Sequence, residues 1–441
     1  MKILLATQDA SLATLIRRSL ERFQYDWIQV DNGVDAFQTA MSLRVNLLIL
    51  DEALPRMGAV EIVHRVNSIE GFSSPHVIAI ARTNAGRERL EKENLQLTEV
   101  MSFPFSLRTL VEKVQQVLEL SSSVVCFGGG TGLFTLLSGL KTLSGLSLTA
   151  IVSMSDDGGS TGKLRALFGI LPPGDVRRSL IALSSAPYLL NELLQHRFRG
   201  GGEFKDHNVG NLLLTALTEM RGSMTEAVKM LGAILSIQGR VIPVTESLNI
   251  LKAELENGAI IEGEHRIDLF EGNDPKLRIE RLWQDPPAKA NSEALDAIRH
   301  ARFIVLGPGD LYTSVISNLI VEGVAPEIRR SKAKKIYICN VMTKPGETTD
   351  YTVSDHIREV VKYLGKDCLD YVFCSSTQLS RDLLELYAQK GQAPVIERNL
   401  DEFRKITQAV VIPADLSMRA ELARHDSLKL ATELKKIFDL Q

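Results

Sequence analysis

The sequence predicts an α/β protein of two domains, each built on a parallel β-sheet. Short, almost continuously apolar runs alternate with longer amphipathic stretches along the whole chain, and many of these runs end in glycine, hydroxyl or acidic residues. Strands buried on both faces read as apolar throughout, and in open parallel sheets the functional crevice lies at the carboxyl ends of the strands. A short polar linker ends at Ser123. We therefore expect one domain at 1–120 and a larger one at 123–441.

The first 120 residues contain five apolar runs, each followed by a helical pattern. The candidate strands are 2–7, 26–30, 46–50, 76–81 and 98–103. Five βα units predict a flavodoxin-like parallel sheet with helices on both faces. Asp51 directly follows the third run, where a functional side chain would lie.

This first domain resembles a response-regulator receiver, because Asp51 ends the third strand and "PF" follows the fifth. Phosphoryl acceptance also needs an acidic pair for Mg²⁺, a hydroxyl and a lysine. Those positions hold Thr7, Gln8, Ala81 and Phe103. We expect a pseudo-receiver used for regulation, docking or dimerisation; a receiver switched by phosphorylation is the alternative.

The larger domain repeats the α/β pattern and predicts a Rossmann-like fold. Its candidate strands are 124–127, 148–153, 303–306, 335–339, 371–374 and 409–412. Between about 239 and 285 the pattern changes to shorter pieces, "GRVIPV", "GAIIEG" and "HRIDLF". That change predicts a small β insertion.

A glycine-rich loop follows the first strand of the larger domain. It contains Gly128, Gly129, Gly130, Thr131 and Gly132, and a helix begins near Leu133. Glycines let the backbone approach a ligand, and the free N–H groups of a helix start favour an anion. Phosphate binding is therefore expected, with a tight ligand-free turn as the alternative. The spacing is neither GxGxxG nor that of a P-loop.

The stretch "SMSDDGGSTGKLR" places Asp156 and Asp157 at the carboxyl end of the next strand. Adjacent strand residues point to opposite faces, so one carboxylate should enter the crevice, where it could bind Mg²⁺. The loop residues after them that could hold an anion are Gly158, Gly159, Ser160, Thr161 and Lys163. Two solvated turn acids are the alternative.

Two further motifs contribute polar side chains. In "LPPGDVRRSL", Asp175 is placed to cap a helix, and at most one of Arg177 and Arg178 should face the site because the two point about 100° apart. In "KDHNVGNLLL", Asn208 and Asn211 could read a base or sugar edge, since an amide both donates and accepts. A helix cap explains these asparagines almost equally well.

A second strand–glycine–helix motif occurs in "FIVLGPGDLYTS". Its candidate site residues are Gly307, Gly309, Asp310, Tyr312, Thr313 and Ser314, and "NVMTKPGET" adds Lys344 and Glu347 after the following strand. Several strand ends with glycine, hydroxyl or acidic residues predict one crevice for a nucleoside diphosphate with attached groups.

The six motifs, in this order, resemble the gluconeogenesis factor (YvcK) family, which is related to the 2-phospho-L-lactate transferases (CofD). The resemblance implies a UDP-sugar-binding regulatory protein, with UDP-GlcNAc or UDP-glucose as ligand, linked to carbon metabolism and to cell-wall and cell-shape control. It places 128–132 near the diphosphate, 156–161 near diphosphate, metal or sugar, Asn208 and Asn211 near the nucleotide, and 307–314 at the closing side. The alternative is a Mg²⁺-dependent transferase that uses a nucleoside diphosphate donor, so enzymatic activity stays open.

Composition and charge argue against several other classes of protein. A net charge of −3 and a pI near 6.3 argue against nucleic-acid binding. The sequence shows no signal peptide, no apolar run of membrane-spanning length and no CxxC pair, so a cytoplasmic protein without membrane contact is expected. The added receiver-like domain suggests a homo-oligomer or a protein partner.

Overall fold

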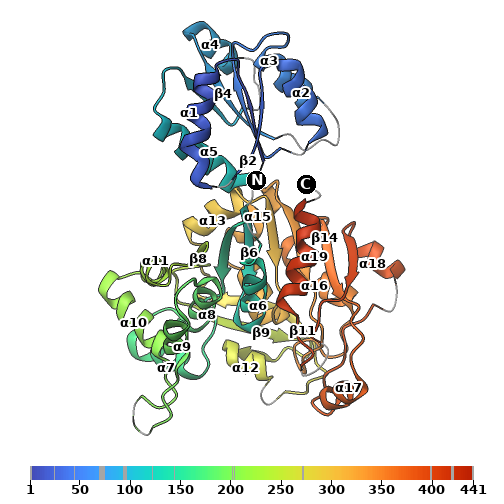
Figure 1. The fold of residues 1–441 in the computed structure, drawn as a ribbon. Helices are drawn as coiled ribbons and strands as arrows, with labels where there is room; N and C mark the ends of the chain where they lie inside the picture. The colour runs from blue at the N-terminus through green and yellow to red at the C-terminus, as the bar shows by residue number, and fades with distance from the viewer. Residues whose placement is uncertain are drawn as a thin grey trace. The chain divides into compact units, whose positions relative to one another are not determined.

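The computed structural model divides into two compact units, 1–122 and 123–440 (Figure 1). It describes residues 2–23, 25–43, 45–68, 75–92, 97–121, 123–143, 145–200, 202, 204–270, 273–397, 400–418 and 422–439. Within these ranges, no helix combines the length and apolar character needed to cross a membrane.

The first unit is a five-stranded parallel sheet in the order β2-β1-β3-β4-β5. Its strands are β1 Lys2–Ala6, β2 Asp26–Val30, β3 Leu47–Asp51, β4 His76–Ala81 and β5 Glu99–Ser102. Its helices are α1 Ala10–Leu20, the 3-10 turn η1 Glu21–Phe23, α2 Gly33–Ser42, α3 Ala59–Asn67, α4 Asn84–Lys92 and α5 Leu107–Ser121. This strand order is the flavodoxin-like one.

Both faces of this sheet are covered, which explains its continuously apolar strands. On β1, Ile3 and Leu5 pack in a core with residues of α1 and α5. The alternate residues Leu4 and Ala6 pack on the other face with residues of α2 and α3. Successive strand side chains point to opposite faces, so a strand enclosed by helices on both sides must be apolar at every position.

The second unit contains a seven-stranded parallel sheet in the order β15-β14-β13-β12-β6-β7-β8 (Figure 1). Its strands are β6 Ser123–Gly128, β7 Ser147–Val152, β8 Arg240–Pro243, β12 Phe303–Leu306, β13 Lys334–Ile338, β14 Tyr371–Ser375 and β15 Val410–Ala414. The chain winds from β6 to β8 in one direction and restarts beside β6 at β12. The boundary between β6 and β12 is therefore a topological switch point, where open α/β sheets bind ligands at the carboxyl ends of their strands.

The helices of the second unit connect these strands. They are α6 Gly130–Leu140, α7 Gly159–Phe168, α8 Gly174–Leu183, α9 Tyr188–Gln195, α10 Val209–Arg221, α11 Met224–Ile234, α13 Ser292–Arg299, the π-helical turn η2 Leu311–Ile316, α14 Ser317–Leu319, α15 Val324–Arg330, α16 Val353–Leu364, α17 Arg381–Ala388, α18 Leu400–Ile406 and α19 Ser427–Asp439. On α6, buried leucines recur at 133, 136, 137 and 140, and this face packs in the core while α6 contacts α8 and α19.

The region between 239 and 285 departs from its predicted form in two places. The segment "GRVIPV" contains β8, which joins the main sheet, so the insertion is smaller than expected: β9 Ile250–Leu255, β10 Ile260–Glu262 and β11 Ile279–Asp285 form a separate antiparallel sheet. The segment "HRIDLF" falls within α12 Glu264–Leu269 and the residue after it, and is not a strand. Asp157 lies far away in sequence and caps the first turn of α12, a contact that the local pattern does not reveal.

Buried His356 gives the second unit a specific acid sensitivity. Its Nδ1 donates to the carbonyl of Thr352 (2.9 Å), its side chain is fully buried, and burial lowers its pKa to about 4. Because the folded pKa is below the unfolded value of about 6.5, the stability that the neutral ring contributes is present above that value and lost as the pH falls through 4. His356→Gln should therefore shrink the fall in unfolding free energy between about pH 7 and pH 4 by roughly 2–3 kcal/mol. Urea titrations at several pH values measure this, and identical profiles for the two proteins would contradict it.

Candidate functional site

A cavity of about 590 Å³ lies at the carboxyl ends of β6, β7, β12 and β13, at the switch point of the large sheet. Its walls come from the loops after these strands, from α6, α8 and α12, and from two C-terminal segments, 387–392 and 422–425. The sequence-predicted residues that line it are Gly129, Gly130, Thr131, Gly132, Asp156, Gly309, Asp310, Ser314 and Lys344.

The glycine loop brings backbone close to the cavity. Gly130 has φ +58°, a left-handed conformation that favours glycine, and begins α6. A Cβ on Gly132 would lie 2.2 Å from the carbonyl oxygen of Pro308, so a side chain here would separate the two glycine loops. Gly130, Thr131 and Gly132, the first turn of α6, all line the cavity, and the start of a helix is a place that favours an anion.

Asp156 and Asp157 point to different sides of their loop, as expected for adjacent residues. Asp156 lines the cavity and accepts the N–H of Gly158 (3.0 Å). Asp157 does not line it; its carboxylate accepts the N–H groups of Glu264 (3.1 Å) and His265 (2.7 Å) at the start of α12. The prediction that Asp157 binds a metal is therefore not supported by its position, because its oxygens are used to hold α12.

Three carboxyl groups meet in the cavity. Asp156, Asp175 and Glu264 all line it. Burial and then the Asp156 charge raise the pKa of Asp175 to about 6, against the opposing charge of Arg178. Burial raises the pKa of Asp156 as well, and burial together with the nearby carboxylates raises that of Glu264 to about 10. The cluster is thus short of positive charge, which Arg178 compensates only in part.

Asp175 differs from its predicted role. Helix α8 begins before it, and the residue at the N-cap, Pro173, makes no side-chain capping bond. The Asp175 carboxylate instead accepts the N–H of Gly130 and faces the cavity. Of the two neighbouring arginines, Arg178 lines the cavity, whereas Arg177 is buried and donates to Asn211 (2.8 Å).

Several predicted ligand contacts instead support the loops from behind. Asn208 caps α10 through the N–H groups of Gly210 and Asn211. Asn211 donates to Ser160 (3.4 Å), whose hydroxyl also contacts His207 (3.1 Å). Neither asparagine lines the cavity, and the helix-cap alternative describes the position of Asn208.

The remaining predicted residues outside the cavity have structural reasons for their positions. The turn of η2 directs Asp310 and Ser314 to the cavity but Tyr312 and Thr313 into the core, where they contact Tyr351 (2.9 Å) and Glu347 (3.2 Å). Five others do not line the cavity either: Gly128, Gly158, Gly159, Thr161 and Gly307. Lys163 is exposed on α7 and does not line the cavity.

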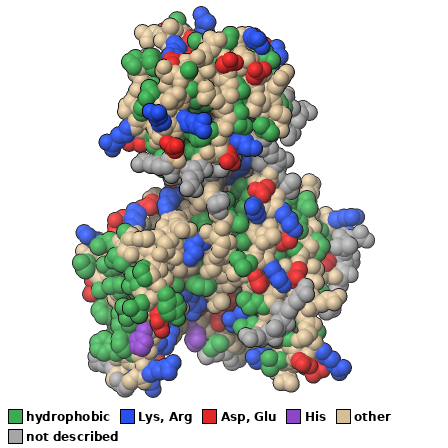
Figure 2. Space-filling model, viewed as in Figure 1, with side chains coloured by type: hydrophobic (Ala, Val, Ile, Leu, Met, Phe, Trp, Pro, Cys, Tyr) green, Lys and Arg blue, Asp and Glu red, His purple; other side chains and the backbone are tan. Residues whose placement is uncertain are grey.

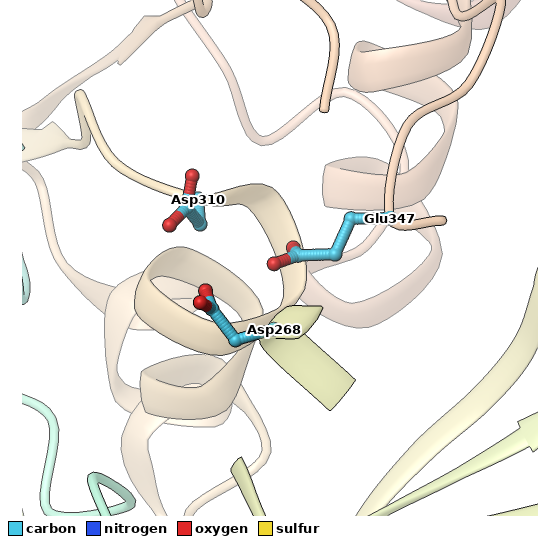
Figure 3. A group of neighbouring side chains, drawn as sticks. All are labelled: Asp268, Asp310 and Glu347. Atoms are coloured by element: carbon cyan, nitrogen blue, oxygen red, sulfur yellow. The ribbon is translucent and has the colours of Figure 1, made fainter. Parts of the chain in front are cut away.

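Asp268, Asp310 and Glu347 form a second carboxylate group, and their oxygens face one another (Figure 3). The ammonium of Lys344 lies among these three side chains: its Nζ is 2.9 Å from Asp310 and 3.3 Å from Glu347, and it also bonds to Asp268. Burial would lower the pKa of Lys344, but the surrounding carboxylates outweigh it and hold the pKa above the usual value. The chain therefore supplies its own cation, the ammonium of Lys344, to this group of three carboxylates.

Sequence reasoning missed the C-terminal wall of the cavity. Tyr387, Lys390, Gln392, Arg424 and His425 line it. None follows a glycine-rich loop or an obvious motif; the basic pair in "ARHD" was the one available signal. Tyr387 is the single Phe, Tyr or Trp among the described lining residues, so the cavity is predominantly polar.

The crevice of the first unit is closed by an internal ion pair. Asp51 is 3% exposed, accepts a hydrogen bond from Thr7 (2.7 Å), and pairs with Arg82 through Nη2 (2.5 Å). Burial would raise the pKa of Asp51, but the bonds from Arg82 and Thr7 outweigh it and hold the pKa below its usual value. Arg82 also contacts Asp9 (3.4 Å). The guanidinium of Arg82 thus lies against the Asp51 carboxylate, at the place that a phosphoryl donor would have to reach.

Comparison with known proteins finds relatives of the second unit. Residues 124–416 match the family described as 2-phospho-L-lactate transferase CofD. The putative gluconeogenesis factor of Thermotoga maritima is 43% identical over 320 residues, 71% of this chain and 98% of that protein. The gluconeogenesis factor of Bacillus subtilis is 37% identical over 312 residues, 70% of this chain and 96% of that protein. A crystal structure of a UPF0052 family member from Bacillus halodurans aligns with a TM-score of 0.67 at 39% identity, covering 71% of this chain and 99% of that one.

Proposed function

This chain belongs to the CofD family and is homologous to the gluconeogenesis factors, and from that premise we propose that it is a regulatory protein that binds a nucleoside-diphosphate sugar. UDP-GlcNAc and UDP-glucose are the ligands to test first. The observation that carries the proposal is the polar cavity at the switch point, with the glycine loop and the start of α6 on one side. The names of the relatives support a link to carbon metabolism; the family resemblance extends the proposal to cell-wall and cell-shape control.

The residues of the cavity divide into two groups that suit the two ends of such a ligand. The backbone N–H groups of Thr131 and Gly132 and the guanidinium of Arg178 are suited to the diphosphate. The C-terminal wall offers Lys390, Gln392 and Arg424, whose donors suit hydroxyl and carbonyl groups of a sugar.

Mg²⁺ fits the donor set of the cavity. Asp156 and Asp175 supply carboxylate oxygens, the ligands that Mg²⁺ prefers, and their raised pKa values show that this cluster is short of positive charge. When bound, the ion would neutralise part of the diphosphate charge. We propose these two residues, rather than Asp156 with Asp157, as the pair that would hold it.

The transferase alternative is favoured by the same carboxylate cluster and by the family description. A flavin-like acceptor would call for a pocket rich in aromatic rings, since flat ring systems pack best against other rings. Among the described lining residues, Tyr387 is the single Phe, Tyr or Trp. For this reason we place sugar binding before the transferase alternative.

Calorimetric titration of the full chain with UDP-GlcNAc, UDP-glucose, GDP and GTP, each with and without Mg²⁺, tests the proposal. We expect a UDP-sugar to bind at least about 10-fold more tightly than GDP, a difference of roughly 1.4 kcal/mol, with the ligand recovered intact. A Mg²⁺-dependent preference for a guanine nucleotide would instead favour the transferase. No binding of any of the four would reject both.

Asp156→Asn should abolish most of the Mg²⁺ dependence of binding, because the neutral amide removes one carboxylate from the cluster. Asp51→Asn is the matched control: it makes the same change in the other unit and should leave the affinity unaltered. Equal Mg²⁺ dependence in wild type and Asp156→Asn would show that the ion binds elsewhere.

A further inference from the structure

Helix α12 lies between two hollows of the second unit. Its residues Glu264, His265 and Asp268 line the cavity, whereas Arg266 lines a second hollow of about 620 Å³. Successive residues of a helix point about 100° apart, so Arg266 is on the opposite face from Glu264 and Asp268. We call the second hollow the α7–β9 pocket; its lining includes Asp157, Gly162, Arg165, Ile250, Gly263 and Arg266.

The second half of α12 is anchored in the core, whereas its first turn is at the surface. Ile267 and Phe270 are buried in the core of the second unit. In the first turn, His265 and Arg266 are exposed. Figure 2 shows acidic, basic and histidine side chains at the lower centre of the second unit, the region in which Figure 1 places α12. The position of this first turn therefore depends on contacts other than core packing.

The Asp157 carboxylate supplies such a contact from the neighbouring loop. It accepts the N–H of Glu264 through Oδ2 (3.1 Å) and the N–H of His265 through Oδ1 (2.7 Å). The first N–H groups of a helix have no partner within the helix, and an acceptor at this end stabilises it. The N-cap residue itself, Gly263, has no side chain that could do so. Asp157 thus caps α12 from 107 residues earlier in the chain.

Three glycines leave room for this close approach. A Cβ on Gly263, which has φ +96°, would lie 2.7 Å from Oδ2 of Asp157. A Cβ on Gly158 would lie 3.1 Å from Nδ1 of His265, and one on Gly162 would lie 2.0 Å from the Asp157 carbonyl oxygen. The glycines of the 156–162 loop therefore also serve the contact with α12, beside any role in holding an anion.

We propose that Asp157 is a positioning residue for the ligand of the cavity: it fixes the first turn of α12, so that Glu264 and His265 keep their places in the cavity wall. The inference rests on the proposed function for the identity of that ligand. The two adjacent carboxylates then act differently, since Asp156 lines the cavity itself and Asp157 holds one of its walls. When the Asp157 contact is lost, the α7–β9 pocket gives the first turn space to move away from the cavity.

Hydrogen exchange of the full chain without ligand tests the contact itself. Asp157→Ala should speed exchange at the amides of Glu264 and His265 about 5- to 10-fold, the size expected for a lost helix cap. Asp157→Asn should have a smaller effect, because its single amide oxygen still accepts one of the two N–H groups. Ser223→Ala, which removes the cap of α11, should leave α12 unchanged. Unaltered exchange of α12 in Asp157→Ala would overturn the inference.

Calorimetry with UDP-GlcNAc tests the consequence for the ligand. Asp157→Ala should weaken binding by the same factor of about 5 to 10 and keep its Mg²⁺ dependence, with part of the affinity recovered in Asp157→Asn. A loss of Mg²⁺ dependence like that expected for Asp156→Asn, or an affinity equal to that of the wild type, would overturn the positioning role. If the wild type does not bind UDP-GlcNAc, the proposed ligand is wrong, and the exchange measurement alone decides whether Asp157 positions α12.

Gly263→Ala provides a second route if Asp157→Ala fails to fold. The added methyl group displaces the Asp157 carboxylate without changing Asp157, so this variant should show the same faster exchange and weaker binding. Gly258→Ala is the matched control: its backbone is also left-handed, with φ +81°, but the methyl group would meet nothing within 4 Å. Equal effects of the two alanine variants on α12 would show that backbone strain, and not the Asp157 contact, is responsible, and would overturn the inference.

Discussion

Lys344→Met should lower the free energy of unfolding by about 3–5 kcal/mol, the cost of leaving a buried charge without its partner. Lys344 bonds to Asp268, Asp310 and Glu347, and Glu347 is almost fully buried. Burial raises the pKa of Glu347 to about 7 even with the ammonium present. Without that ammonium, three carboxylates would face one another (Figure 3), and they would have to take up protons or separate.

Urea unfolding at neutral pH measures this effect. Lys390→Met is the matched control, because Lys390 lines the same cavity but is exposed, and its unfolding free energy should change little. The Lys344→Met protein should recover part of its stability as the pH falls below 7, since protonation removes the repulsion among the carboxylates. Equal stability of the two variants would contradict the role assigned to Lys344.

Arg178→Ala should weaken nucleoside-diphosphate binding about 100-fold, or roughly 2.7 kcal/mol, the size expected for one charge-assisted contact in a partly enclosed site. Arg178 lines the cavity beside Asp175, 3.9 Å from its carboxylate, and its side chain is 45% exposed. Removing it takes away the cation that we propose contacts the diphosphate, and it leaves the carboxyl cluster without its compensating charge.

Calorimetry with UDP-GlcNAc compares this variant with Arg178→Lys and Lys163→Ala. The lysine variant keeps the charge but loses the planar guanidinium, so it should recover only part of the affinity. Lys163→Ala should bind as the wild type does, because Lys163 is exposed on α7 and does not line the cavity. If Lys163→Ala lost more affinity than Arg178→Ala, the ligand would have to bind on the other side of the 156–161 loop.

The sequence predicted the α/β architecture well because its strands are enclosed by helices on both faces. Every side chain of β3 is buried. A strand of this kind is apolar at every position, so it stands out in the sequence as an uninterrupted apolar run. The glycine loops were equally visible, since a close backbone approach such as that of Gly132 to Pro308 leaves no room for a side chain. Buried strand residues and loop glycines are required by the local backbone and its immediate surroundings. They can therefore be recognised from short stretches of sequence.

Side-chain direction was not predictable in the same way. Asn208 and Asn211 have the chemistry of ligand contacts, but tertiary packing uses one as a helix cap and the other to hold Arg177 and Ser160. Tyr312 follows a glycine loop, yet the η2 turn directs it to Tyr351. The C-terminal wall was missed because its residues do not directly follow a strand: Tyr387 lies in α17, and 422–425 lie between β15 and α19.

The cavity is lined at one end by Gly129 to Gly132, from the beginning of the second unit, and at another by Arg424 and His425, from near its end. A ligand bound as proposed would therefore act as a reversible staple between the two ends of about three hundred residues of chain. During synthesis this binding site comes into existence only when almost the whole unit has been made. If the proposed ligand binds there, its occupancy would report that folding is complete, and its concentration would set how much binding adds to the stability of the finished unit.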